Sequence, residues 1–139
     1  MTSPTVTSPT VEVTADLVAS LVERGGYTHP LFRPTPAQQA SGRSAPLPGQ
    51  AVLLLAGGLV EQSGALDDAI ALVELRSVRF LRMVSAGDVL RVVLAPGRGE
   101  PTRSGKLLRE DSWTVVDASG EHVLEASAVM LVRGPDERA

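Results

Sequence analysis

Two side chains that exchange protons stand two residues apart in the chain: Tyr27 and His29. Histidine takes up and releases a proton near neutral pH, whereas a tyrosine hydroxyl, with a pKa of about 10, is a reluctant base and serves better as a donor. Pro30 follows directly and restricts the backbone of His29. The pair could therefore act as base and donor on one substrate. A structural role is equally open, in which His29 caps the loop and Tyr27 closes an edge of the core.

The composition argues against several other chemistries. The 139 residues include no cysteine and only two histidines, so disulfides, thiol nucleophiles and Cys/His zinc spacings are excluded, and we expect no metal or redox cofactor. The net charge of −3 offers no basic field for nucleic acid. The longest apolar run, 51–60, is half of the ~20 residues that a membrane span needs. The first ten residues do not resemble a signal peptide, so we expect a cytoplasmic protein.

The chain length fits one domain, which we place at residues 11–133. Residues 1–10 contain a doubled Thr-Ser-Pro-Thr and are predicted to form a disordered tail, and 134–139 a flexible C-terminus. Thr14 is placed to cap a short amphipathic helix that ends at Gly25 and Gly26. Residues 27–49 are rich in proline, serine and glycine and predict a long loop, and loops of this length often carry function.

The second half predicts one buried helix followed by strands. Residues 51–64 are apolar nearly all round, which indicates a helix buried on every side, with Pro48 at its first turn and Gly57-Gly58 placed for close approach of another backbone. Strands are expected at 70–84, 89–94, 106–116 and 123–132. An antiparallel meander wrapped around a central helix satisfies this order. The predicted fold class is α+β, with a hotdog arrangement.

Several segments together resemble the MaoC-like hydratases and dehydratases of acyl thioesters. They are Val11 to Leu17, Gly26 to Phe32, the Pro48-Gly49 entry to the buried helix, and Val78 to Leu90, where an Arg-Phe strand is followed by a Gly-Asp turn and an apolar strand. The resemblance covers most of residues 11–133. It implies a hotdog dimer with active sites at the subunit boundary and an acyl group carried on coenzyme A or an acyl carrier protein.

The catalytic loop departs from the pattern of that family. Its motif is Asp-x-Asn-Pro-x-His, whose Asp and His move a proton at C2 and handle water at C3. Tyr27 stands at the Asp position, His29 at the Asn position and Phe32 at the His position. Because phenylalanine cannot exchange a proton, the usual pair cannot operate unchanged.

Three hypotheses follow from this departure. The dehydratase chemistry could be rebuilt with His29 as general base and Tyr27 as donor or oxyanion partner. Alternatively Glu61, near the end of the buried helix, could activate water or attack a thioester as in thioesterase branches of the fold, although it could simply mark where the helix meets solvent. The third hypothesis is a catalytically silent subunit that binds acyl thioesters, either alone or beside an active homologue.

Further residues are candidates for substrate binding. The backbone amides at the helix start, around Pro48, Gly49 and Gln50, could polarise a thioester carbonyl, and Phe32 is expected beside the acyl pocket. Arg79, with its neighbours on the same strand, could contact the phosphates of the carrier, or could belong to a solvated strand face. We expect an acyl-CoA or acyl-carrier substrate and a homodimer or a hetero-oligomer, with no nucleic acid and no membrane.

Overall fold

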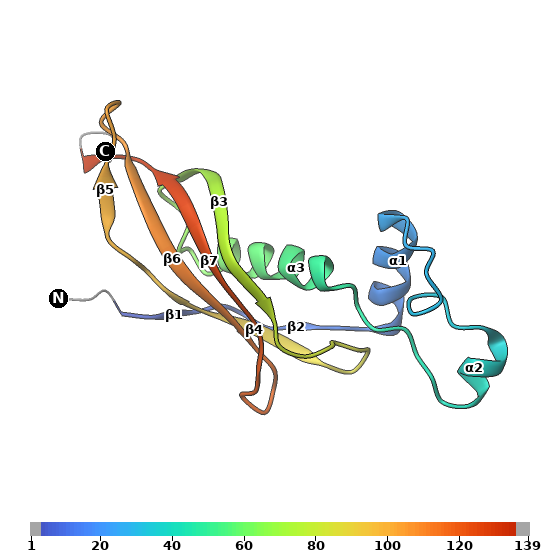
Figure 1. Ribbon diagram of the computed structural model, residues 1–139. Helices are drawn as coiled ribbons and strands as arrows, with labels where there is room; N and C mark the ends of the chain where they lie inside the picture. Colours follow the sequence, from blue (N-terminus) through green and yellow to red (C-terminus); the bar gives the residue numbers. More distant parts are fainter. Residues whose placement is uncertain (1–3, 136–139) are drawn as a thin grey trace.

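The computed structural model describes residues 4–135, which form an antiparallel sheet packed on one long helix (Figure 1). The helices are α1 (Ala15–Gly25), α2 (Pro36–Ala40) and α3 (Gly49–Gln62). The long strands are β3 (Ala69–Phe80), β4 (Val89–Ala95), β6 (Leu107–Val116) and β7 (His122–Val132). The short strands are β1 (Val6–Thr7), β2 (Val11–Glu12) and β5 (Gly99–Pro101).

The order of strands differs from a meander. The sheet runs β1-β4-β6-β7-β3, with β2 also on β4 and β5 also on β6, and every pair is antiparallel. β3 therefore lies beside β7 at an edge, and the chain crosses the sheet before β4 begins. The four long strands were predicted within a few residues, but their predicted meander connectivity is wrong because periodicity along a strand carries no information about its neighbour.

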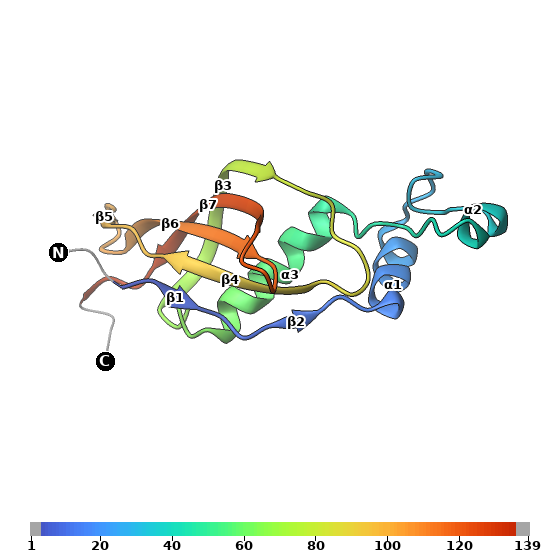
Figure 2. The same ribbon diagram turned by 90° about the horizontal axis from the view of Figure 1, so that it is seen from below.

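The core lies between the sheet and α3, which crosses one face of the sheet (Figure 2). Apolar side chains of α3 such as Val52, Ala56 and Leu59 are buried against residues of the sheet such as Leu94 and Trp113. The expectation that α3 is buried on every side is wrong, because Leu54 is 65% exposed. The order of elements and this layering are those of a hotdog fold.

The glycines of α3 face open space within the chain. A Cβ added at Gly57 or at Gly58 would meet no atom of the described residues within 4 Å, apart from the helix's own backbone. The predicted close approach of another backbone is therefore not made by this chain. Together with exposed Leu54, these positions leave one side of α3 uncovered.

Helix α1 ends as its sequence predicts. The Thr14 hydroxyl accepts a hydrogen bond from the amide of Leu17, and Gly26 closes the helix in the left-handed region at φ 75°. Val18 and Val22 are buried beneath α1. In both views α1 and α2 lie beyond the end of the sheet, on the side where α3 begins, and α2 is farther from the sheet than α1 (Figures 1 and 2).

The predicted disordered tail is corrected for residues 4–10. Val6 and Thr7 pair with Leu94 and Val93 of β4, and Ser8 is buried, where its hydroxyl accepts a hydrogen bond from the amide of Val92 at 2.9 Å. The pairing satisfies the open edge of β4, which local polarity does not reveal. Residues 1–3 and 136–139, which include most of the predicted flexible C-terminus, lie outside the described residues.

A buried ion pair ties the far end of α3 to the sheet. Asp111 is fully buried and accepts hydrogen bonds from Nε of Arg109 at 2.8 Å and from the amide of Gly97 at 3.1 Å. Arg109 also donates to the carbonyl of Ala65, at 3.1 Å, in the connection from α3 to β3. This network fixes the end of α3 that lies away from α1.

Candidate functional site

The first turn of α3 presents unpaired backbone donors. Pro48 precedes the helix, and its carbonyl accepts hydrogen bonds from the amides of Ala51 and Val52. The amides of Gly49 and Gln50 donate to no acceptor among residues 4–135. Free amides at a helix start, supported by the helix dipole, stabilise negative charge that develops on a nearby oxygen. This local chemistry suits a polarised carbonyl.

An apolar pocket of about 260 Å³ adjoins these amides, and we call it the α3 pocket. It is lined by Leu31, Phe32, Pro46, Leu47, Gly49, Val52, Phe80, Leu81, Arg82, Met83, Val84 and Val123. The Phe80 ring packs against the helix start so closely that a Cβ on Gly49 would lie 3.0 Å from two of its carbons. Glycine at this position therefore allows an aromatic wall beside the free amides.

The loop between α1 and α2 brings Tyr27 and Phe32 to the same place. The Tyr27 hydroxyl donates a hydrogen bond to Oε1 of Gln50 at 3.3 Å, and the rings of Tyr27 and Phe32 meet edge to face at 5.0 Å. Nε of Arg33 donates to the carbonyl of Tyr27 at 2.8 Å, and its guanidinium pairs with Glu23 at 2.9 Å. These contacts fasten the loop to α1 on one side and α3 on the other.

His29 is exposed and is held by its own loop. Its Nδ1 accepts a hydrogen bond from the amide of Leu31 at 3.0 Å, and its carbonyl accepts from the amides of Phe32 and Arg33. A neutral imidazole whose Nδ1 is an acceptor carries its proton on Nε2. In this arrangement the ring presents a donor rather than a base to its surroundings. The structure thus places His29 as a cap of the loop, outside the lining of the α3 pocket.

The remaining predicted residues divide between the site and its surroundings. Phe32 and Gly49 line the α3 pocket, while buried Pro48 and exposed Gln50 flank it. Glu61 is exposed at the other end of α3, about 18 Å along the helix from Gly49 at 1.5 Å per residue. Arg79 is exposed on β3 and lines neither this pocket nor the larger cavity described below.

The arginines flanking Arg79 are held by carboxylates of this chain. Arg76 pairs with Glu74 and, at 2.9 Å, with Glu110. Arg82 is the one charged side chain in the lining of the α3 pocket, and its guanidinium bonds to Asp117 at 2.6 Å and Asp88 at 3.1 Å. Arg82 thereby joins the connection between β3 and β4, which carries one wall of the pocket, to the turn between β6 and β7.

The two carboxylates that pair with Arg82 have lowered pKa values. Hydrogen bonds from Ser119 and Arg82 lower the pKa of Asp117 far below its ordinary value. Burial raises the pKa of Asp88, but hydrogen bonds from Arg82 and the Ser85 amide outweigh burial, so the net pKa is lowered. These groups remain charged partners of Arg82 and do not exchange protons with a substrate near neutral pH.

Sequence reasoning missed Phe80 as a wall of the pocket. The chain has only two phenylalanines, and both line the α3 pocket. Because only 3% of the residues are aromatic, each phenylalanine is a candidate for a pocket wall. The prediction named Phe32 and not Phe80.

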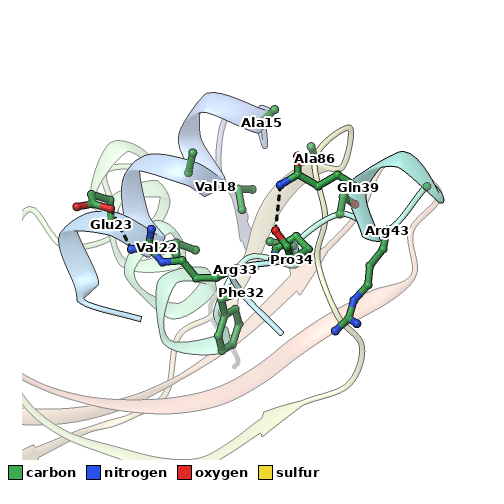
Figure 3. Close-up of a pocket in the computed structure, with 14 residues that line it drawn as sticks. Ala15, Val18, Val22, Glu23, Phe32, Arg33, Pro34, Gln39, Arg43 and Ala86 are labelled. Atoms are coloured by element: carbon green, nitrogen blue, oxygen red, sulfur yellow. Dashed lines mark hydrogen bonds and ion pairs between the residues drawn. The ribbon is translucent and has the colours of Figure 1, made fainter. Parts of the chain in front are cut away.

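A second, larger cavity of about 840 Å³ lies between α1 and the segment 32–45, and we call it the α1 cavity. Its floor includes Val18 and Val22 of α1, and Arg33, Gln39 and Arg43 stand around it (Figure 3). Arg33 is paired with Glu23, and the side-chain amide of Gln39 donates to the carbonyl of Pro34. Phe32 lines this cavity as well as the α3 pocket.

Within residues 4–135, no group of three or more His, Asp or Glu side chains is arranged to hold a metal ion. In the same part of the chain, no helix combines the length and apolar character that crossing a membrane requires.

Comparison with solved structures identifies the fold. A protein assigned as a MaoC domain dehydratase, from Chloroflexus aurantiacus, matches with TM-score 0.84 and 25% identity over 100% of this chain and 40% of its own. A MaoC-like dehydratase from Rhodospirillum rubrum matches with TM-score 0.77 and 14% identity over 96% and 93% of the two chains. The HadBC (3R-hydroxyacyl-ACP dehydratase) complex from Mycobacterium tuberculosis gives TM-score 0.71 and 21% identity over 92% and 94%.

The chain therefore has the α+β hotdog fold of the MaoC-like dehydratases and (R)-hydratases, as its sequence predicted. No protein-family model matches the sequence, and the comparison with curated proteins finds no match. At these identities the likeness speaks for the fold, and the activity has to be argued from the site.

Proposed function

We propose that this protein binds acyl thioesters as a subunit of a MaoC-like hydratase or dehydratase. The acyl group occupies the α3 pocket, and its thioester carbonyl receives hydrogen bonds from the amides of Gly49 and Gln50. The observation that carries the proposal is that Gly49, whose amide is unpaired, lines a pocket formed almost wholly by apolar side chains, with the unpaired amide of Gln50 next along the helix. The carrier is coenzyme A or an acyl carrier protein, and no metal or redox cofactor takes part.

The acid/base pair comes from an active homologous subunit. Hydration or dehydration needs a group that exchanges a proton at C2 and one that handles the oxygen at C3. The lining of the α3 pocket contains neither, because Arg82 is its one ionisable side chain and is held by two carboxylates. Hetero-complexes stand among the proteins of similar fold, including HadBC and the ChsH1-ChsH2 complex from Mycobacterium tuberculosis, which supports an assembly of this kind.

A self-sufficient dehydratase is the second candidate, and the position of Tyr27 favours it. Its hydroxyl reaches the first turn of α3, so it could donate a proton to a leaving hydroxyl at C3. His29 would then have to release the Leu31 amide before Nδ1 could accept the proton from C2. Hydrolysis through Glu61 gains no support, because that carboxylate lies at the opposite end of α3 from the free amides.

The partner subunit docks on the free edge of β3. Among the described strands β3 pairs only with β7, and its exposed side chains include Ile70, Leu72 and Val73, each about half exposed. An exposed apolar edge strand is a template for pairing with another chain. The uncovered side of α3 around Leu54 adds to this surface. In the proposed assembly the partner at this edge is the active homologue, a second copy takes its place when the protein is purified alone, and the assembly works in the cytoplasm.

Binding of short acyl thioesters tests the proposal. We expect butyryl-phosphopantetheine to bind the wild-type protein in isothermal titration calorimetry, and Gly49→Ala to weaken binding about tenfold, because the new Cβ crowds the Phe80 ring and displaces this wall of the pocket. Gly58→Ala is the matched control, since its Cβ meets open space in the same helix. Equal affinity of the Gly49→Ala and wild-type proteins would contradict the proposed site.

A further inference from the structure

Phe32 belongs to the walls of two cavities. It is the single residue that lines both the α3 pocket and the α1 cavity, whose other lining residues differ. The two linings also meet along the chain, since Ala45 faces the α1 cavity and Pro46 the α3 pocket. Residue 32 therefore stands at their boundary, and its ring packs against the ring of Tyr27.

The ring of Phe32 is fixed rather than free. It meets the ring of Tyr27 edge to face, and Tyr27 is fastened to Gln50 on α3. The amide of Phe32 donates to the carbonyl of His29 at 2.9 Å, which holds the backbone from the other side. A half-buried ring with these two supports keeps one position beside the α3 pocket.

The α1 cavity offers an apolar surface beyond that boundary. Val18 and Val22 face it from α1, and Ala15, Ala19, Ala45 and Ala86 are further apolar residues of its wall. The charge of Arg33 is balanced by Glu23, and Arg43 stands on the side away from α1 (Figure 3). With about 840 Å³ against about 260 Å³, this space is large enough to receive an alkyl chain that the α3 pocket cannot contain.

We propose that Phe32 sets the acyl chain length that this protein binds, by closing the α3 pocket against the α1 cavity. This inference rests on the proposed function, because it concerns the substrate of the same pocket. Wild-type protein is selective for short chains, which end at the ring. With a smaller residue at position 32, the two cavities join and the distal part of a longer chain lies along α1.

Affinity measured across a chain-length series tests this inference. The probes are butyryl-, hexanoyl-, octanoyl- and dodecanoyl-phosphopantetheine, which carry the part common to coenzyme A and carrier proteins. In the wild-type protein, affinity stops rising after the short chains. In Phe32→Ala it continues to rise, by up to about fourfold for each methylene that becomes buried. Phe32→Leu keeps more of the apolar packing and should show the same trend to a smaller extent. It keeps the test valid if Phe32→Ala does not fold.

Two further variants identify where the chain goes. Ala19→Phe fills the α1 cavity from the side of α1, so the double variant Phe32→Ala/Ala19→Phe should lose the gain for dodecanoyl while butyryl binding stays as in Phe32→Ala. Leu31→Ala enlarges the α3 pocket without touching the boundary, so it should not extend the accepted length.

The outcomes separate this inference from the proposed function. If short chains bind the wild-type protein but neither Phe32→Ala nor Phe32→Leu extends the accepted chain length, the role of Phe32 is overturned. The proposed function then stands. A gain for long chains that survives Ala19→Phe would also overturn it, because the chain would then run elsewhere. Failure of every thioester to bind folded wild-type protein would overturn the proposed function and this inference with it.

Discussion

The amide of Leu31 donates a hydrogen bond to Nδ1 of His29 across 3.0 Å, so the loop's own backbone occupies the ring nitrogen that could accept a proton. The nearby Tyr27 hydroxyl is directed to Gln50. The two proton-handling side chains of the loop therefore both make contacts that hold the loop in shape. The same contacts give Phe32 its place beside the pocket.

Substitutions of His29 test whether this residue caps the loop or acts as a catalytic base. His29→Ala should reduce the free energy of unfolding by about 0.5–1 kcal/mol, because it deletes one exposed hydrogen bond. His29→Asn should recover most of that loss, since an asparagine oxygen accepts a hydrogen bond from the amide two residues on. Urea unfolding of the three proteins provides the comparison. If His29→Asn loses as much free energy of unfolding as His29→Ala, the capping role is ruled out.

The cluster around Arg82 predicts sensitivity to acid. Because the pKa values of Asp88 and Asp117 are lowered in the folded protein, their contribution to stability is complete above the unfolded pKa of about 4 and is lost as pH falls through the folded values. Urea midpoints measured from pH 7 downward should stay level until about pH 4 and then fall. Arg82→Gln should make this decline shallower, because the hydrogen bond from Ser119 still lowers the pKa of Asp117 but the contribution of Arg82 to both lowered pKa values is removed. An unchanged slope in Arg82→Gln would refute the assignment.

The sequence predicted those elements whose residues decide their structure locally. The buried helix followed from a long apolar run, and the bounds of α1 followed from Thr14 and Gly26, whose capping contacts the structure contains. Thr35 followed three residues later by Gln38 forms a capping box at α2, and this local pattern is a helix signal inside the predicted long loop. Local chemistry of this kind is visible without knowing the neighbours.

Elements decided by distant partners could not be predicted in the same way. Val6 and Thr7 form a strand because β4 offers an open edge, and the position of β3 beside β7 depends on a crossover. In the site, the loop resemblance located Phe32 and the helix start located Gly49. The occupation of Nδ1 of His29 and the pairing of Arg82 with Asp117 depend on side-chain positions that spacing does not reveal.

The buried ion pair at the far end of α3 should matter greatly to stability. Asp111→Ala leaves Arg109 without its closest partner in a mostly buried position, and should lower the free energy of unfolding by about 3–5 kcal/mol. Glu110→Ala, at the adjacent exposed position of β6, should change it by about 0.5 kcal/mol or less. Urea unfolding of the two variants provides the comparison. If both lose a similar free energy of unfolding, burial does not control the energy of this network.

The β3 edge should control assembly. Light scattering is expected to find the wild-type protein as a dimer and Val73→Lys largely as a monomer, because a lysine on the apolar edge opposes pairing. Ala118→Lys adds the same charge to the exposed turn between β6 and β7 and should leave the dimer intact. A monomeric wild-type protein, or a dimer that tolerates Val73→Lys, would place the partner elsewhere.

The most direct test of the central claim is mass spectrometry of the purified protein incubated alone with 3-hydroxyacyl and enoyl thioesters of coenzyme A and of an acyl carrier protein. Because the α3 pocket holds no group that exchanges a proton, we predict that the thioesters bind and that neither gains nor loses water. Turnover that disappears in Tyr27→Phe or His29→Ala would contradict this account and establish a self-sufficient dehydratase.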